Sequence, residues 1–189
     1  EDLVKVAVTA PSGTNCQPWT FTMLPNRAAV VQLGRQVGDF FRRTNRLAAR
    51  RWLRTLLRWI GKPALERYFR QHYDTVARAL AEWDSGQGDR LFHGATAVIV
   101  VAADRDASCP VEDAMLATGQ ILLAAHAMGL GSCLIGFVIE AMRRDERIAR
   151  MLGLAEREMP CAVIALGWPD ETYQRVAGRK PVRVRYWRA

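Results

Sequence analysis

The sequence predicts an α+β sandwich in which helices flank one central sheet, because segments with helical and strand periodicity alternate along its 189 residues. The clearest strand is the continuous apolar run 96–103, which is typical of a strand covered on both faces. The clearest helix spans about residues 112–128, where small residues alternate with large ones and indicate a tight interior or a dimer interface. A chain of this length suits one domain with a substantial core.

The N-terminal half is predicted to hold a helix end, two strands and two helices, in that order. Pro11 stops the first helix, Asn26 begins the turn between the strands, and residues 34–38 interrupt the second strand. Gly61 and Pro63 separate the two helices, each of which has an apolar face at helical spacing. The predicted elements are residues 3–10, 19–23, 28–33, 39–60 and 64–83.

The C-terminal half continues the alternation. After the strand 96–103 and the helix 112–128, Gly129 is suited to terminate the helix because glycine readily takes the left-handed conformation. The remaining predicted elements are a short extended piece within 130–136, a helix over 139–152, a strand over 161–166 and a terminal strand over 182–187.

The segment 10–21, Ala-Pro-Ser-Gly-Thr-Asn-Cys-Gln-Pro-Trp-Thr-Phe, is the most informative part of the chain. Pro11 and Pro18 restrict φ and remove backbone donors, and Gly13 permits positive φ. Such a loop presents a hydroxyl and two amides at defined positions before the chain enters a strand. Taken alone, it is either a helix-to-strand connector or a device that holds a planar polar heterocycle.

Four motifs, in order, resemble the FMN-dependent nitroreductase family. Residues 10–19 match Ala-Pro-Ser-x-x-Asn-x-Gln-Pro-Trp, and residues 113–136 are similar to the family's central helix, Gly-Leu-Gly turn and flavin-edge loop. Residues 159–169 resemble its last core strand and Gly-x-Pro ending, and residues 178–181 resemble its C-terminal Arg-Lys-Pro signature. The resemblance covers most of the chain outside the basic stretch 39–71.

The resemblance implies one nitroreductase-like domain over 1–189: an α/β sandwich with a mainly antiparallel central sheet and a helical insertion at 39–84. The implied cofactor is FMN, and the flavin rather than a side chain carries the chemistry, so no catalytic residue is predicted. The predicted contacts are Ser12, Asn15, Gln17, Ile135, Gly136, Arg179 and Lys180. Ser12, Asn15 and Gln17 would form hydrogen bonds with the flavin ring or ribityl chain. Ile135 and Gly136 would approach the reactive edge of the ring. Arg179 and Lys180 would hold the phosphate. A side chain at Gly136 would collide with the ring.

In that family, NAD(P)H reduces FMN and leaves before a small electron-poor acceptor, such as a nitroaromatic or a quinone, takes the electrons in the same pocket. The flavin lies at a homodimer interface, so the resemblance implies a homodimer. Members carry an Arg-x-Ser-x-Arg segment that grips the FMN phosphate. It precedes the loop that corresponds to residues 10–19 here, which we call the Pro-Ser loop. The printed sequence begins at Glu1, so either that segment lies upstream or the phosphate is held differently.

The residues themselves support no rival catalytic site. Ser12 lacks a neighbouring base, Cys16 lacks an adjacent cation that would lower its pKa, and His126 fits a core or interface position. The four cysteines have no Cys-x-x-Cys spacing, and the three histidines are separated, so no metal site is predicted. No signal peptide is visible and no apolar run reaches the roughly 20 residues of a membrane span, so we expect a reducing, cytoplasmic location.

The formal charge of +8 is concentrated in one segment. Between residues 42 and 70 the chain has ten cations and one acid, Glu66. The cations are Arg42, Arg43, Arg46, Arg50, Arg51, Arg54, Arg58, Lys62, Arg67 and Arg70. The aromatic residues there fall at helical spacing, which favours packing over base stacking, so neither nucleic acid nor a membrane is an expected partner.

Three interpretations of the insertion 39–84 remain open at this stage. It is a lid over the flavin pocket, a solvated or docking face for a ferredoxin-like domain or partner, or a site for nucleic acid or anionic lipid. The alternative function for the whole chain is a nitroreductase-like scaffold without redox activity that binds anionic partners through Arg42 to Arg70.

Overall fold

The central sheet of the protein has four antiparallel strands in the order β1-β2-β4-β3 in the computed structural model, which describes residues 1–172, 174, 175 and 177–187. The strands are β1 (Trp19–Leu24), β2 (Ala97–Asp104), β3 (Gly131–Leu134) and β4 (Glu158–Gly167). The predicted α+β class and mainly antiparallel sheet are confirmed. The pairing register between β2 and β4 shifts between Val101 and Ala102.

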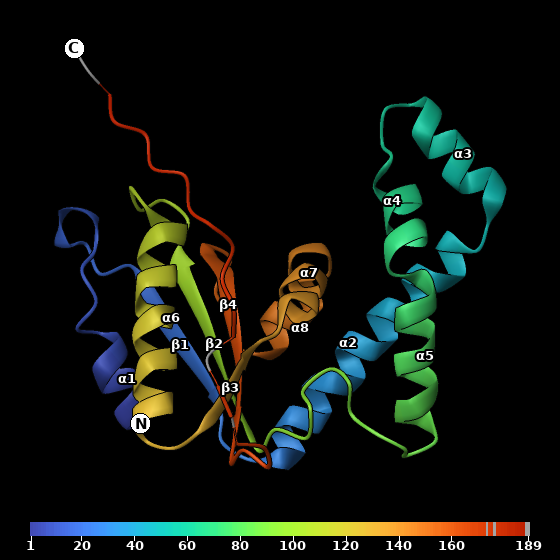
Figure 1. Cartoon of the computed structure of the whole chain (residues 1–189). Helices are drawn as coiled ribbons and strands as arrows, with labels where there is room; N and C mark the ends of the chain where they lie inside the picture. Colours follow the sequence, from blue (N-terminus) through green and yellow to red (C-terminus); the bar gives the residue numbers. More distant parts are fainter. Residues whose placement is uncertain (173, 176, 188–189) are drawn as a thin grey trace.

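Helices cover both faces of the sheet, as the apolar run at 96–103 predicted (Figure 1). One face carries α1 (Asp2–Ala7) and α6 (Pro110–Ala127), and the other carries α2 (Arg27–Ala48), α7 (Gly136–Arg144) and α8 (Glu146–Met151). Successive side chains of β2 point to opposite faces of the sheet. Val98, Val100 and Ala102 pack in the core on the α2 side, and the residues between them pack in the core on the α6 side.

The predicted strand 28–33 is wrong, because this segment begins the 22-residue helix α2. The Asn26 side chain accepts a hydrogen bond from the Ala29 amide at 3.0 Å and so caps the helix. Val30, Leu33 and Val37 are then buried at helical spacing. The predicted interruption at 34–38 is also absent, since Gly34 lies inside the helix and faces Trp83, whose ring a Cβ would approach to 3.0 Å.

Three of the other predicted helices are divided in the structure, whereas the predicted helix 112–128 is the single helix α6. The basic segment folds as the end of α2, α3 (Arg51–Trp59), α4 (Ala64–Gln71) and α5 (Tyr73–Asp84). The segment 139–152 folds as α7 and α8, separated by Asp145, whose extended backbone and side chain cap α8. Local breaks of this kind depend on single capping residues, and apolar periodicity continues across them.

The predicted terminal strand 182–187 is also wrong. Within the described part of the tail, residues 177–187 form no strand, and Val182, Val184, Tyr186 and Trp187 are exposed. Figure 1 shows this tail extending away from the body of the molecule toward the C-terminus. An alternating apolar pattern becomes a strand only where an edge accepts it, and this chain's own sheet does not pair with the tail. Among the described helices none is long and apolar enough to cross a bilayer.

Candidate functional site

The Pro-Ser loop brings three predicted contacts together. Ser12 Oγ accepts a hydrogen bond from the Gln17 amide at 3.0 Å, and the Gln17 side-chain amide donates to Asn15 Oδ1 at 3.1 Å. The short 3-10 turn η1 (Gly13–Asn15) lies between Ser12 and Gln17. Asn15 and Gln17 are exposed, so their remaining donors and acceptors face outward.

The backbone of this loop is strained. Thr14, Asn15 and Gln17 have φ angles of 52°, 56° and 48°, in the left-handed region that non-glycine residues rarely adopt. Asparagine tolerates this region, whereas a β-branched threonine adopts it at a cost. Strain of this kind persists only where the surrounding structure imposes it, and it concentrates at ligand-binding sites.

Asp113 holds the loop in place from the first turn of α6. Its Oδ1 accepts a hydrogen bond from the Gly13 amide at 2.9 Å, and the Cys16 thiol donates to Oδ2 at 3.6 Å. The residue is buried, and the positive end of the helix dipole stabilises a carboxylate there. Sequence reasoning missed this role. The available signal was an acidic residue in the first turn of an otherwise apolar helix.

Ile135 and Gly136 lie at the junction of β3 and α7. Ile135 is buried, and its amide donates to Val163 O at 2.8 Å, which sets the chain's exit from the sheet. Gly136 is exposed, and a Cβ added there would meet nothing within 4 Å. The protein's own packing therefore does not require glycine at 136, and its absent side chain leaves room in front of the α7 N-terminus.

The insertion borders this junction through Phe137, the residue after Gly136. The Phe137 ring contacts Phe41 of α2 edge-to-face at a centroid distance of 5.5 Å, and it contacts His72 at the same distance. A mainly apolar cavity of about 380 Å³ opens beside it between α2 and α5. Its lining includes Gly34, Phe41, Trp83 and Phe137. The base of the insertion thus forms a wall next to Gly136.

The two groups of candidate residues lie on opposite faces of the sheet. The Pro-Ser loop is tied to α6 through Asp113, whereas Ile135 belongs to the core on the α2 and α7 side. Figure 1 shows α1 and α6 on one side of the sheet and α7 on the other. A single chain therefore does not bring all the predicted contacts into one pocket.

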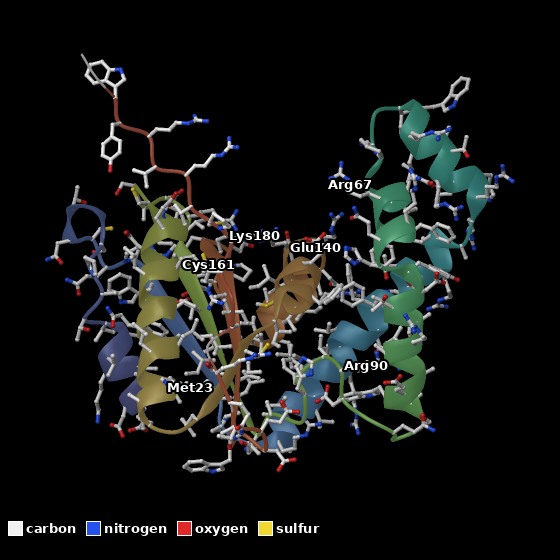
Figure 2. All side chains as sticks on the ribbon, in the orientation of Figure 1. Met23, Arg67, Arg90, Glu140, Cys161 and Lys180 are labelled. Carbon is white, nitrogen blue, oxygen red and sulfur yellow. The ribbon has the colours of Figure 1, made fainter. Side chains whose placement is uncertain are left out.

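Arg179 and Lys180 lie in the exposed tail. Arg179 donates to the carbonyls of Ala177 and Gly178 at 2.9 and 3.3 Å. Within the described residues, neither side chain forms a hydrogen bond or ion pair with the Pro-Ser loop or with Gly136. Figure 2 marks Lys180 near the point where the tail leaves the body.

The structure offers no competing metal or nucleophile site among the residues that it describes. No group of three or more histidine, cysteine or acidic side chains is placed to hold a metal ion. All four cysteines are unpaired, and burial raises the pKa of the Cys161 thiol, which makes it a poor nucleophile. His72 packs against Tyr68 and Phe137 as an aromatic side chain.

The sequence profile of the Nitroreductase family matches residues 1–168 of this chain. The chain belongs to the nitroreductase family. This match extends through the Pro-Ser loop, Asp113 and the β3–α7 junction, and it ends before the tail that holds Arg179 and Lys180.

Curated relatives of this nitroreductase-family chain differ in their names. An iodotyrosine deiodinase from Thermotoga neapolitana is 25% identical over 193 residues, covering 98% of this chain and 86% of that protein. Archaeal proteins from Methanothermobacter thermautotrophicus and Archaeoglobus fulgidus, provisionally named NADH dehydrogenase/NAD(P)H nitroreductase, are 43% identical over 61 residues and 34% over 87. These matches cover 32% and 43% of this chain, and 31% and 49% of the archaeal proteins.

Solved structures share the nitroreductase fold. A nitroreductase with bound FMN from Desulfitobacterium hafniense superposes with a TM-score of 0.61 at 22% identity, covering 97% of this chain and 84% of that one. An iodotyrosine deiodinase bound to FMN and 3-iodo-L-tyrosine gives 0.55 at 23% identity, covering 97% and 84%. At this identity the similarity establishes the fold, and the ligands named belong to those proteins.

Proposed function

We propose that this protein is an FMN-dependent oxidoreductase that takes electrons from NAD(P)H and passes them to a small electron-poor acceptor. The observation that carries the proposal is the space at Gly136, which no part of the described chain fills. It lies before an α7 N-terminus whose amides suit the electron-rich edge of a planar ring. When bound, FMN supplies the electron transfer, and the protein binds and orients it.

We propose that Ser12, Asn15 and Gln17 contact the ring or ribityl chain. Their uncharged groups suit an edge that alternates donors and acceptors, and the strained loop holds them in one arrangement. Arg179 and Lys180 stay proposed phosphate ligands, supported by their charge and their place in an accessible tail. The base of the insertion, at Phe41 and His72, is proposed to wall the site beside Phe137.

We propose a homodimer, because the loop of one chain and Gly136 of the same chain lie on opposite faces of the sheet. A second copy can bring its loop to the first copy's Gly136. Two exposed apolar surfaces support the association. One is the outer side of α6, with Met115, Leu116 and Leu123, and the other is the tail. The unpaired cysteines are compatible with a reducing compartment, and we place the protein in the cytoplasm.

The test is a visible absorption spectrum of the purified protein with added FMN, compared between the wild type and Gly136→Leu. We expect the wild type to bind FMN and the variant not to. The melting temperature should be unchanged, because outside the adjacent residues and the nearby backbone of α7 no atom lies within 4 Å of the new Cβ. Gly88→Leu is the matched control, since a Cβ there also meets nothing within 4 Å and Gly88 does not line the cavity beside Phe137. A wild type that refuses FMN, or a Gly136→Leu variant that retains it, would contradict the proposal.

A further inference from the structure

The outer face of α3 is apolar and exposed, contrary to the packing role that its helical spacing suggested. Trp52, Leu56 and Trp59 recur at intervals of four and three residues, so they lie on one side of the helix. Their exposed fractions are 63%, 51% and 83%. Ile60, directly after the helix, is also exposed and extends this surface, which we call the tryptophan face. Figure 1 shows α3 at the far end of the arm formed by α2 and α5.

The opposite side of α3 contacts the neighbouring helices, since Leu53, Arg54 and Leu57 are half-buried there. Arg54 forms a salt bridge with Glu66 of α4 at 2.9 Å, and its guanidinium lies 3.6 Å from the centre of the Phe69 ring. The same side chain donates to the carbonyl of Ala48 and thereby caps the end of α2. Arg54 therefore joins α3 to both neighbouring helices, and these contacts hold the helix with its tryptophan face outward.

Cations surround the tryptophan face. Arg42, Arg43 and Arg54 form ion pairs, but among the described residues the other seven cations of the basic segment form none. These seven are Arg46, Arg50, Arg51, Arg58, Lys62, Arg67 and Arg70. Arg51 and Arg58 immediately precede the two tryptophans and so flank the apolar side, while Figure 2 places Arg67 on α4 of the same hairpin. The surface therefore combines apolar groups with unneutralised positive charge.

This combination is complementary to an anionic bilayer surface. Tryptophan prefers the interface between headgroups and acyl chains, and short amphipathic helices with flanking arginines bind there through apolar burial and attraction to anionic lipid. Nucleic acid would satisfy the arginines but offers the central Trp52–Leu56–Trp59 surface no comparable apolar layer. A second copy that brings its loop to Gly136 would contact α7 and the base of the insertion, whereas α3 lies at the far end of the arm (Figure 1).

We propose that the hairpin of α3 and α4 docks the protein on membranes that contain anionic phospholipid. Trp52, Leu56 and Trp59 enter the headgroup region, and Arg51, Arg58 and the neighbouring cations contact lipid phosphates. This docking depends on neither flavin nor redox activity, so its test is separate from that of the proposed function.

The experiment is flotation of the full-length protein with vesicles of phosphatidylcholine alone or with added phosphatidylserine. We expect flotation with the phosphatidylserine vesicles, suppression by high salt, and a blue shift of tryptophan emission. Arg51→Gln/Arg58→Gln should weaken binding by about 30-fold, since each surface cation near anionic lipid contributes roughly a factor of five. Trp52→Ser/Trp59→Ser should abolish the blue shift and most of the flotation.

Matched controls are Trp168→Ser, which removes a tryptophan outside the hairpin whose exposure lies between those of Trp52 and Trp59, and Arg35→Gln, which removes an exposed arginine from α2. Both should float as the wild type does. Failure of the wild type to float at low salt would overturn the proposal. So would unchanged flotation of the double variants, tighter binding to a double-stranded oligonucleotide than to vesicles, or a Trp52→Ser/Trp59→Ser variant that loses FMN binding instead of vesicle binding.

Discussion

The Asp113 carboxylate accepts a hydrogen bond from the Gly13 amide at 2.9 Å, joining two residues that are 100 positions apart in the sequence. This contact, with the Cys16 thiol on the second oxygen, fixes the Pro-Ser loop to the first turn of α6, where Asp113 is buried. The strained φ angles at Thr14, Asn15 and Gln17 need such an external restraint. Asp113 is therefore a positioning residue for the proposed flavin contacts.

Asp113→Ala should weaken FMN binding by about tenfold, because the loop loses one charge-assisted hydrogen bond and no longer holds its amides in one arrangement. Fluorescence titration with FMN measures the affinity, and hydrogen exchange of the loop peptide should be faster in the variant. Asp113→Asn keeps an acceptor for the Gly13 amide and should restore most of the affinity. Glu112→Ala, one residue away on an exposed position, serves as the control. If Asp113→Ala bound FMN with the affinity of the wild type, Asp113 would not be a positioning residue for the flavin contacts.

Apolar runs in the sequence predicted the central strands of the sheet, whereas the predicted strands 28–33 and 182–187 were wrong. Strand β2 was predicted within one residue of its bounds, since its continuous apolar run has no other stable placement than between two helical layers. The strand predicted at 28–33 was wrong because contacts outside the segment decide its structure. Its local β propensity is overridden by the Asn26 cap and by packing of Gly34 against Trp83, a contact between residues 49 positions apart.

The resemblance supplied the candidate contacts residue by residue and a site at a homodimer interface, but not the arrangement of those contacts within one chain. Ser12, Asn15 and Gln17 do form one hydrogen-bonded group. Their separation from Gly136 by the thickness of the sheet depends on topology, which spacing along the chain does not contain. The exposure of Trp52 and Trp59 was missed likewise, because amphipathic periodicity describes two sides of a helix without saying which of them meets protein.

Asp145 links α2 to the α7–α8 pair, and its ionisation should make stability depend on pH. It accepts hydrogen bonds from Arg147 at 2.7 and 2.8 Å and pairs with Arg43 of α2 at 2.7 Å. The Arg147 hydrogen bond, followed by the charges of Arg147 and Arg43, lowers the pKa of Asp145 below its usual value of 3.8. A lowered folded-state pKa gives stability that is complete above the unfolded value and lost as pH falls through the folded one.

Asp145→Asn should therefore reduce the free energy of unfolding by about 1–2 kcal/mol at neutral pH, since asparagine keeps the cap acceptor but removes the charge. Urea denaturation at neutral and acidic pH measures this difference, which should shrink below about pH 4 as the wild-type carboxylate is protonated. Asp170→Asn is the control, because Asp170 is exposed and forms no ion pair among the described residues. A difference that stays constant down to the acid transition would show that the charge of Asp145 does not contribute.

The opposed positions of the Pro-Ser loop and Gly136 predict complementation between two defective chains. If each flavin site takes its loop from one copy and its Gly136 from the other, Ser12→Trp and Gly136→Leu homodimers should each bind no FMN. A heterodimer of the two variants contains one site with both defects and one site with none. Co-expression with two different affinity tags and sequential purification isolates that heterodimer.

Its flavin content should be about half that of the wild-type dimer, because symmetry leaves one complete site of two. The absorption of bound FMN per dimer measures it, and sedimentation confirms the oligomeric state. A heterodimer without FMN would mean that each site is built from a single chain, which requires the loop to reach its own Gly136 around the sheet. A Ser12→Trp homodimer that binds FMN normally would instead show that the loop does not contact the flavin. The Gly136→Leu variant would still test the role of Gly136 separately.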